Sequence, residues 1–350
     1  MITTDAVGGV WRYSVDLARG FAKAGIDPAL AVLGPPPGAD QIVEAAGLRL
    51  IDTGLALDWT APDPAALRET AAVLAGLARR LGARSVHLHT PALAAEAPWA
   101  MPTVAVAHSC VGTWWQAVRG GPLPEDLAWR VAAVAHGLAE ADVVIAPTHA
   151  FAEMLARFYR PGRSISVIRN GAPPMERHDG SRETAVFSAG RLWDDAKNAT
   201  ALDRLAATVD VPVVAAGPLS GPSGEQFKPL HLHATGRLAA ADVGKLMRGI
   251  TIFAAPSRYE PFGLAVLEAA RAGMALALAD IPTFRELWDD AAAFFHPDDD
   301  DGLRDAVLRL NENPMPYAAR AATRAARYSI DVTVDATLRV HHAVQSTMAS

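Results

Sequence analysis

Cysteine is almost missing from this chain of 350 residues, in which Cys110 is the only one. A single cysteine cannot form an intramolecular disulfide, and it cannot by itself supply a zinc or iron–sulfur site. This scarcity excludes a small secreted domain held together by disulfides. It favours a reducing compartment, so we expect a cytoplasmic protein.

Excess positive charge is also missing, because 32 basic side chains stand against 38 acidic ones and leave a formal net charge of −6. No surface-wide attraction for nucleic acid follows from this balance, and we expect no nucleic-acid partner. Lysine is the scarcer basic residue, and the chain holds only four, which are Lys23, Lys197, Lys228 and Lys245. Each lysine is therefore mildly informative about function.

One stretch without charge needs attention, because residues 97–118 form a run of 22 residues that lacks a charged side chain. That length would span a bilayer. Pro98, Pro102 and His108 interrupt the run, which we interpret as a buried strand at 103–107 followed by a polar-tipped loop. The first residues show neither a basic region nor an apolar core, so we expect no signal peptide.

Apolar residues make up 51% of the chain and charged residues 20%, which is enough apolar side chain for two cores at roughly 150 residues per domain. Short strand-like runs alternate with longer segments of helical period, which predicts an α/β protein with parallel sheets. A first strand is reduced to residues 2–4, so either it is short or the true start lies a few residues upstream. The other predicted strands are 29–33, 85–88, 103–107, 143–146, 164–168, 185–189, 211–215, 231–235, 250–254 and 275–279, and the predicted helices of the first half are 11–24, 64–81, 124–139 and 149–158.

A break in this pattern occurs at residues 170–174, and the polar stretch 176–183 after it is the best linker in the chain. Two α/β units of similar size joined near residue 170 would leave a cleft between them. Ligands of such sheets bind beyond the carboxyl ends of the strands. Chemistry is therefore expected just after each strand.

The most informative segment is 257–268, which follows an apolar strand and contains Pro261 at a favoured first-turn position of a helix. The amides of Phe262, Gly263 and Leu264 would then be free donors at a helix start. Gly263 lets a bulky anion approach the backbone. Such an arrangement is an anion site suited to phosphate.

Two carboxylates flank this predicted phosphate site, Glu260 just before the helix and Glu268 two turns into it. On a helix, eight residues separate them by ~12 Å with a rotation of only ~80°. This suits a molecule with hydroxyls at both ends and a diphosphate in the middle, which describes a nucleotide sugar. The alternative is that Glu268 is solvated and pairs with Arg271 three residues later.

A second segment, 190–198, follows the strand at 185–189 and holds two cations, Arg191 and Lys197. Arginine binds as a fork and lysine as a point charge, so the two can clamp one diphosphate without a metal. The alternative, which we weigh equally, is that both are solvated and pair locally with Asp194 and Asp195. Because lysine is scarce in this chain, the presence of Lys197 slightly favours the functional interpretation.

Weaker signals occur in the first half of the chain. The Gly8-Gly9 pair at the first strand-to-helix turn permits close approach of a ligand, but it lacks the dinucleotide-binding glycine spacing. His108 follows a strand and could hydrogen-bond a sugar hydroxyl, although a structural histidine is the commoner case. His87 and His89 alternate along a strand without nearby carboxylate or thiol ligands, as do the histidines at 231 and 233, and we assign no metal. The acidic run 298–301 precedes a helix and is better explained by capping.

Taken together, these motifs resemble the retaining glycosyltransferases of family 4, which have the GT-B fold of two Rossmann-like domains. The resemblance covers nearly the whole chain, and its most specific element is the Glu260 to Glu268 pair. The other segments that carry it are the Gly8-Gly9 turn, the strand ending in His108-Ser109, the crossover at 168–171, the 190–198 loop, and the last helix after Tyr328-Ser329. In this family that last segment crosses back to the first domain. The resemblance thus implies an acceptor-side domain of 1–169 plus 330–350 and a donor-binding domain of 170–329.

The resemblance also implies roles for single residues. Arg191 and Lys197 would hold the diphosphate, and Glu268 would accept hydrogen bonds from the ribose hydroxyls. Glu260, with the amides of residues 262–264, would contact the transferred sugar and its phosphate. Gly8 and Gly9 would lie against the diphosphate. His108 would bond a sugar hydroxyl near the reacting carbon.

The expected activity is metal-independent transfer of a hexosyl unit from a UDP- or GDP-linked sugar, with no other cofactor, in bacterial polysaccharide or glycoconjugate synthesis. The acceptor stays open between a sugar, a lipid-linked and a small molecule. Trp11, Trp114 and Trp115 leave a peripheral contact at the inner face of the membrane open as well. Two other functions remain as alternatives, which are a GT-B-fold epimerase of sugar nucleotides and a catalytically silent nucleotide-sugar-binding protein.

Overall fold

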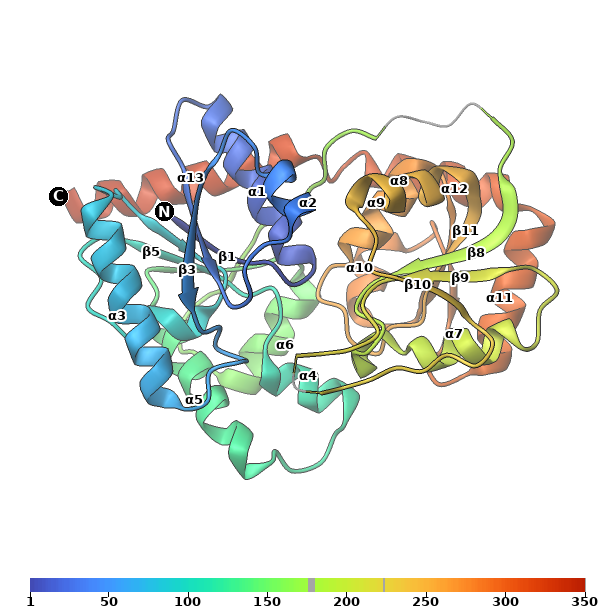
Figure 1. Ribbon diagram of the computed structural model, residues 1–350, viewed down its shortest axis with the longest axis horizontal. Helices are drawn as coiled ribbons and strands as arrows, with labels where there is room; N and C mark the ends of the chain where they lie inside the picture. Colours follow the sequence, from blue (N-terminus) through green and yellow to red (C-terminus); the bar gives the residue numbers. More distant parts are fainter. Residues whose placement is uncertain (176–179, 223, 350) are drawn as a thin grey trace. The chain divides into compact units, whose positions relative to one another are not determined.

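The chain, seen here in a computed structural model that describes residues 1–175, 180–222 and 224–349, forms two compact units. Unit 1 comprises Met1–Gly171 and Ile330–Ser350, and unit 2 comprises Ala172–Ser329. Each unit contains a parallel sheet with helices on both of its faces (Figure 1). The expected α/β class is confirmed. Residues 176–179 of the predicted linker lie outside the described residues.

Among the described residues of unit 1, seven strands form one parallel sheet in the order β3-β2-β1-β4-β5-β6-β7. These strands are β1 (Ile2–Asp5), β2 (Ala29–Leu33), β3 (Arg49–Leu55), β4 (Val86–Leu88), β5 (Thr103–Val106), β6 (Val143–Ala146) and β7 (Ser166–Val167). The helices are α1 (Gly9–Lys23), α2 (Ala39–Glu44), α3 (Pro64–Arg80), α4 (Val111–Val118), α5 (Glu125–Glu140), α6 (His149–Tyr159) and α13 (Ile330–Ala349), with a 3₁₀ helix at Pro91–Ala94.

Helix starts in unit 1 follow local capping chemistry. The Asp63 carboxylate accepts the Ala66 amide at 2.9 Å before α3, and Pro64 occupies the first helical position. The Thr148 hydroxyl accepts the Phe151 amide at 3.1 Å before α6. These side chains satisfy amide groups that have no partner within their helix.

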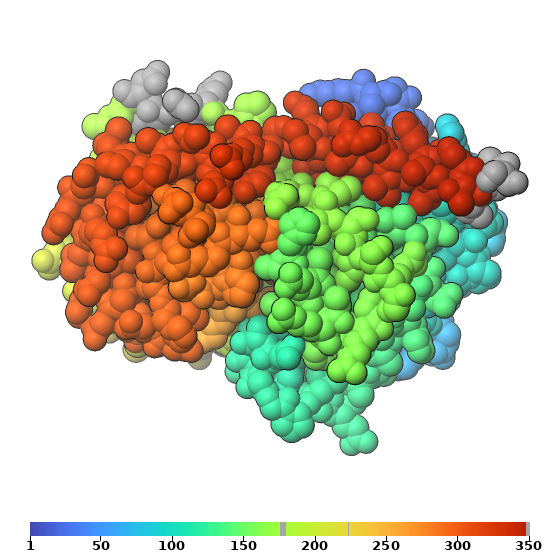
Figure 2. Space-filling view, turned by 180° about the vertical axis from the view of Figure 1, so that it is seen from behind, coloured from blue at the N-terminus to red at the C-terminus, as the bar shows by residue number. Residues whose placement is uncertain are grey.

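Helix α13 packs on unit 1 although it follows unit 2 in the chain. Its Val340 and Val344 contact a buried cluster of Val104, Val106 and Ile145 from β5 and β6. Gly20 of α1 lies directly under Val334 of α13, where a larger side chain would collide with the valine methyl groups. Figure 2 shows the outer side of α13, in dark red, beside the green segments of the same unit.

Some expectations for unit 1 were wrong. The uncharged run 97–118 holds β5 as expected, but α4 replaces the predicted loop, and Trp114 and Trp115 lie half-buried on this helix. Trp11 is a buried side chain of α1 and donates to Glu44 at 2.9 Å, so its ring is not exposed for the membrane contact that the sequence left open. Within the described ranges, none of the helices combines the length and the apolar character that crossing a membrane requires.

Four histidine rings meet in unit 1, of which the sequence pattern joined only His87 and His89 and gave no sign of His341. His87 Nδ1 lies 3.0 Å from His341 Nε2 of α13, and His108 Nε2 lies 2.9 Å from His89 Nδ1. The His87 and His89 rings touch edge to face at 4.9 Å between centroids. Burial lowers the pKa of His341 and of His108 to about 4, and it lowers the pKa values of His87 and His89 well below their usual range.

In the part of unit 2 that the structure describes, six strands form a parallel sheet in the order β10-β9-β8-β11-β12-β13. These strands are β8 (Glu183–Ala189), β9 (Val213–Ala216), β10 (His233–Gly236), β11 (Ile250–Ala255), β12 (Ala275–Ala279) and β13 (Ala293–Phe295). The helices are α7 (Ala199–Ala206), α8 (Ala240–Gly249), α9 (Leu264–Ala272), α10 (Pro282–Trp288), α11 (Asp300–Glu312) and α12 (Pro314–Ala325), with a 3₁₀ helix at Asp195–Lys197.

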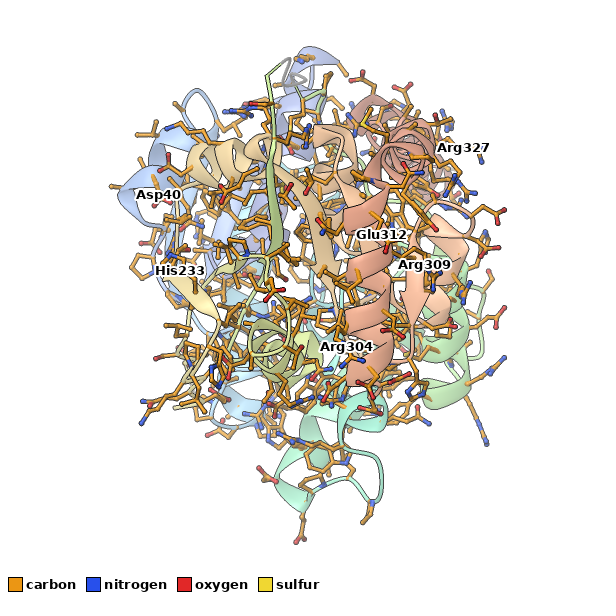
Figure 3. All side chains as sticks on the ribbon, turned by 90° about the vertical axis from the view of Figure 1, so that its right-hand side faces the viewer. Asp40, His233, Arg304, Arg309, Glu312 and Arg327 are labelled. Carbon is orange, nitrogen blue, oxygen red and sulfur yellow. The ribbon has the colours of Figure 1, made fainter. Side chains whose placement is uncertain are left out.

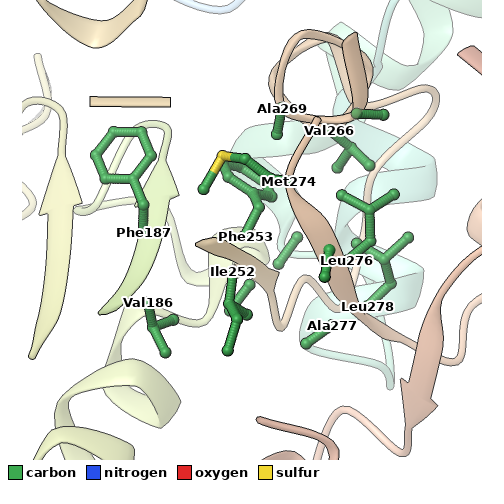
Figure 4. Close-up of a cluster of buried hydrophobic side chains, with 14 of the residues drawn as sticks. Val186, Phe187, Ile252, Phe253, Val266, Ala269, Met274, Leu276, Ala277 and Leu278 are labelled. Atoms are coloured by element: carbon green, nitrogen blue, oxygen red, sulfur yellow. The ribbon is translucent and has the colours of Figure 1, made fainter. Parts of the chain in front are cut away.

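The core of unit 2 lies on the two central strands of its sheet. Phe187 of β8 and Phe253 of β11 are opposite each other in the ladder and pack edge to face at 6.1 Å (Figure 4). Met274 and Leu276 fill the space beneath α9, and both are fully buried. Buried side chains of this size each contribute roughly 1.5–3 kcal/mol to folding.

The acidic run before α11 caps that helix, as the sequence predicts. Asp299 accepts the Gly302 amide at 2.9 Å, and Asp300 forms an ion pair with Arg204 of α7 at 2.6 Å. Arg304, Arg309 and Glu312 lie along α11 on the side away from the sheet (Figure 3). The polar residues of α11 thus face solvent, while Leu303 and Leu310 are buried.

Acid is expected to destabilise unit 1, because unfolding returns the buried histidines to a pKa of about 6.5. Below that pH the unfolded chain binds more protons than the folded chain, so this part of the stability is complete above pH 6.5 and is lost as the pH falls towards 4. We expect the unfolding temperature, followed by circular dichroism, to fall between pH 7.5 and pH 5. The fall should be smaller in His341→Gln, whose amide can still bond to His87 without titrating.

The matched control is His136→Gln, at an exposed position of α5, which should leave the pH dependence as in the wild type. Equal pH dependence of the wild type and His341→Gln would contradict the assignment of this effect to the buried ring.

Candidate functional site

The candidate site of unit 2 lies where the strand order of the sheet reverses. Strands β8 and β11 are hydrogen-bonded neighbours, with β9 on the far side of β8 and β12 on the far side of β11. Loops that leave the carboxyl ends of two such strands part to opposite sides, and ligands of doubly wound sheets bind in that crevice. The two segments singled out in the sequence, 190–198 and 257–268, follow β8 and β11.

Arg191, in the loop after β8, forms a local ion pair. Arg191 donates to the Asp194 carboxylate at 2.7 Å, and its guanidinium lies 5.8 Å from the centre of the Trp193 ring. Asp194 also accepts the Ala196 amide at 3.0 Å and so begins the short 3₁₀ helix. Burial would raise the pKa of Asp194, but the charges of Arg191 and Lys197 outweigh it and keep that pKa below its usual range. The predicted local pairing of Arg191 is therefore present.

Lys197 pairs with a residue that is distant in the chain. Its ammonium group forms an ion pair with the Glu260 carboxylate from the loop after β11, with side-chain exposures of 21% and 18%. The two residues are 63 positions apart in the chain. They line one pocket, whose described lining is Ser188, Ala189, Gly190, Leu192, Lys197, Leu202, Phe253, Ala255, Pro256, Ser257, Glu260, Gly263, Ala265 and Val266. The structure thus brings together one predicted cation and one predicted carboxylate, while Arg191 and Glu268 are not part of this lining.

Asn198, at the end of the loop after β8, bonds to the segment that follows β11. No role was predicted for it from the sequence. Its amide donates to the carbonyl oxygens of Pro256 at 3.1 Å and Pro297 at 2.9 Å. The backbone adds a bond from the Arg258 amide to the Ala196 carbonyl at 2.9 Å. Asn198 is buried and adopts the left-handed conformation with φ 53°, which asparagine tolerates better than most residues. Asparagine directly before a helix was the signal that could have identified it.

The helix at the pocket starts later than predicted. Helix α9 begins at Leu264, and its first internal hydrogen bond runs from the Leu267 amide to the Gly263 carbonyl. Its first-turn amides therefore belong to residues 264–266, so Leu264 keeps its predicted place, while those of Phe262 and Gly263 precede the helix. The reason is Gly263, whose left-handed φ of 86° interrupts a helix that would otherwise start at Pro261.

This late start changes the geometry of the carboxylates. Glu268 lies just over one turn into α9 and is half-buried, and Glu260 is not on the helix, so the helical spacing does not relate the two. The backbone carbonyl of Glu260 accepts the Thr283 hydroxyl at 2.6 Å, which fixes its loop. Phe262 is buried and packs edge to face on Tyr328 at 6.0 Å. Arg271 donates to the carbonyl oxygens of Pro173 at 2.8 Å and Tyr328 at 3.0 Å.

The remaining predicted residues belong to unit 1 and follow its strands. Gly8, with φ 94°, and Gly9 are exposed at the start of α1, directly after β1. His108 follows β5, is half-buried and contacts the Tyr13 ring edge to face at 4.7 Å. Through His89 it joins the four-histidine group. Within the residues that the structure covers, no cluster of histidine, cysteine and carboxylate side chains has the arrangement of a metal site.

The two parallel sheets, each with the switch-point strand order of a Rossmann-like domain, define the GT-B class of α/β proteins. The family model described as Glycosyltransferase Family 4 matches residues 7–175, and the model described as Glycosyl transferases group 1 matches residues 194–328. The chain belongs to the family 4, group 1 glycosyltransferases.

Individual relatives agree with this membership. A phosphatidyl-myo-inositol mannosyltransferase of Mycolicibacterium smegmatis is 32% identical over 120 residues, which are 33% of this chain and 31% of that protein. The match thus spans about a third of that relative. Sucrose-phosphate synthase from Thermosynechococcus elongatus has a similar fold with a TM-score of 0.78 at 16% identity, over 100% of this chain and 99% of that one. Anabaena HepE in complex with UDP-glucose has a TM-score of 0.74 at 17% identity, over 98% and 99% of the two chains.

Gly217, directly after β9, lies against the backbone of Gly190 in the 190–198 loop. It was not among the residues predicted from the sequence. A Cβ atom at this position would overlap the carbonyl oxygen of Gly190, and the φ of 147° is one that side chains rarely adopt. We expect Gly217→Ala to destabilise unit 2 by about 3 kcal/mol or more, from backbone strain and overpacking combined. Urea unfolding followed by fluorescence measures this change.

Gly236→Ala separates the two causes, because Gly236 has a φ of 72° but open space around its Cβ position. Only the strain of roughly 1–2 kcal/mol should remain there. Equal losses of stability in the two variants would show that the contact with Gly190 does not matter.

Proposed function

We propose that this chain is a retaining glycosyltransferase that binds a UDP- or GDP-linked hexose in the pocket of unit 2 and transfers the hexosyl unit to an acceptor. The observation that carries the proposal is the convergence of the Lys197–Glu260 pair with the first turn of α9 at the ends of β8 and β11. The relatives support it, since they include a mannosyltransferase and a protein in complex with UDP-glucose. The work of such an enzyme would be polysaccharide or glycoconjugate synthesis in the cytoplasm.

Diphosphate is the ligand group that we propose for this pocket. Lys197 would supply a point charge from the lining, and the amides of residues 264–266 the positive end of a helix. Arg191, on the same loop as Lys197 but outside the lining, would add a fork of donors from the rim. Lys197 is paired with Glu260, whose side chain is 18% exposed, and Arg191 is paired with Asp194, whose side chain is 5% exposed. A bound diphosphate would share the two cations with these carboxylates. The cations would therefore be in place before the ligand arrives.

The proposed roles of the two glutamates differ. Glu260, next to Lys197 in the pocket, would contact the transferred sugar. Glu268, one turn into α9, would accept hydrogen bonds from the ribose hydroxyls. His108 of unit 1 would hydrogen-bond a hydroxyl of the sugar, and Gly8 and Gly9 would lie against the diphosphate.

The proposed mechanism follows from the charge that develops in the reaction. As the anomeric bond breaks, positive charge grows on the sugar and negative charge on the departing diphosphate, and fixed donors around the diphosphate stabilise it. A double displacement would need a carboxylate nucleophile beneath the sugar. We nominate none and propose attack from the face that the diphosphate leaves, with the diphosphate taking the acceptor proton. The acceptor would be a sugar, a lipid-linked sugar or a small molecule.

Lys197→Ala and Glu268→Ala should each weaken the binding of nucleoside diphosphates, because the first removes a charge from the phosphates and the second a partner of the ribose. We expect a loss of about tenfold or more in affinity for UDP or GDP, measured by isothermal titration calorimetry. Lys245→Ala and Glu312→Ala are matched controls at exposed positions, and both should bind like the wild type. Unchanged affinity in both site variants would defeat the assignment of these roles.

Transfer should not need a metal ion, because Arg191, Lys197 and the amides of α9 neutralise the leaving group. We expect donor turnover by the full chain, measured across a panel of nucleotide sugars, to persist within about twofold in excess EDTA. Nuclear magnetic resonance of the product should show the anomeric configuration of the donor. Conversion of the donor alone into an epimer would instead identify an epimerase, and binding without any turnover would identify a silent binding protein.

A further inference from the structure

The contact between His89 and His108 determines which nitrogen of His108 carries its proton. His108 Nε2 lies 2.9 Å from His89 Nδ1, so one of these two nitrogens donates to the other. The only ring nitrogen of His108 left for another molecule is Nδ1, for which the described residues provide no hydrogen-bond partner. The direction of the bond to His89 therefore decides whether Nδ1 is a donor or an acceptor.

The far side of the His89 ring indicates this direction. His89 Nε2 is buried and finds no hydrogen-bond partner among the described protein atoms. A buried N–H group without an acceptor is rarer in proteins than a buried lone pair without a donor. The proton of His89 therefore belongs on Nδ1 and is donated to His108 Nε2. Because burial keeps His108 neutral, with a pKa of about 4, its own proton belongs on Nδ1.

The other histidine pair follows the same rule independently. His87 Nε2 is also buried without a partner in the described part of the chain, so His87 donates from Nδ1 to His341 Nε2 at 3.0 Å. His341 then carries its proton on Nδ1, which faces the Ser85 hydroxyl oxygen at 2.9 Å. One assignment, with every proton on Nδ1, thus satisfies all three contacts. The reverse assignment would bury two N–H groups without acceptors.

We propose that His89 is a positioning residue that holds His108 as its Nδ1–H tautomer, so that unit 1 offers a hydrogen-bond donor at the end of β5. Tyr13 supports this arrangement by contacting both rings edge to face, at 4.7 Å for His108 and 5.3 Å for His89. A His108 of this form can donate to a sugar hydroxyl or a phosphate oxygen, but it cannot take a proton through Nδ1. Its role in transfer rests on the proposed function, whereas its tautomer does not.

The experiment uses the full chain labelled with ¹⁵N-histidine and long-range proton–nitrogen correlation spectra at pH 7.5, without added ligand. The His108 signals are assigned by their loss in His108→Gln. We expect the wild type to carry the His108 proton on Nδ1. His89→Leu, which fills the space without a donor, should shift His108 to a form that contains Nε2–H. His89→Asn, whose amide can donate from a position close to that of Nδ1, should retain Nδ1–H.

His341→Gln, at the other end of the histidine group, is the control that should leave the His108 spectrum unchanged. A wild-type His108 with its proton on Nε2 would overturn the proposal, and this result needs no variant to fold. An Nδ1–H signal that persists in folded His89→Leu would overturn it as well.

Turnover of the donor gives a second readout. We expect kcat/KM to fall about tenfold in His89→Leu and to stay within about threefold of the wild type in His89→Asn. Full activity in a folded His89→Leu that has lost Nδ1–H would overturn the role in transfer. A wild type without activity on any nucleotide sugar would contradict the proposed function alone, since the spectra still decide the tautomer.

Discussion

The parallel pairing of β8 with β11 is the constraint on which the candidate site depends. Val186 and Phe187 of one strand lie opposite Ile252 and Phe253 of the other, all of them buried, so the pairing is fixed by the core. Because the strands are parallel neighbours, the loops that follow them start side by side. Lys197 and Glu260 can form an ion pair across 63 residues only for this reason.

The polar groups of these loops are held in place by bonds to the backbone as well as to one another. Asn198 ties the first loop to two carbonyl groups, and the Arg258 amide ties the second loop to Ala196. Cations fixed in this way lose little further freedom when an anion binds, which is how preorganised sites stabilise a developing negative charge. The strained or crowded glycines at 217 and 263 belong to the same arrangement, since each allows a backbone path that a side chain would block.

Unit 1 uses neutral, buried rings where unit 2 uses charges. Its histidines come from β4, from the end of β5 and from α13, and burial keeps their pKa values low. Each pair of rings shares one buried hydrogen bond, and such bonds make the position of each ring specific. The group also links the C-terminal helix to the sheet that carries His108.

Local patterns in the sequence predicted the α/β alternation, most buried strands and the residue types that follow them, because apolar runs, proline and glycine act locally. It did not indicate β3 and β13, since edge strands such as β3 alternate between exposed and half-buried side chains and lack a continuous apolar run. The fold was needed to show that Lys197 pairs with Glu260, that Gly217 lies against Gly190, and that His89 bonds to His108. These contacts join residues that neighbouring strands bring together, and no local pattern records which strands are neighbours.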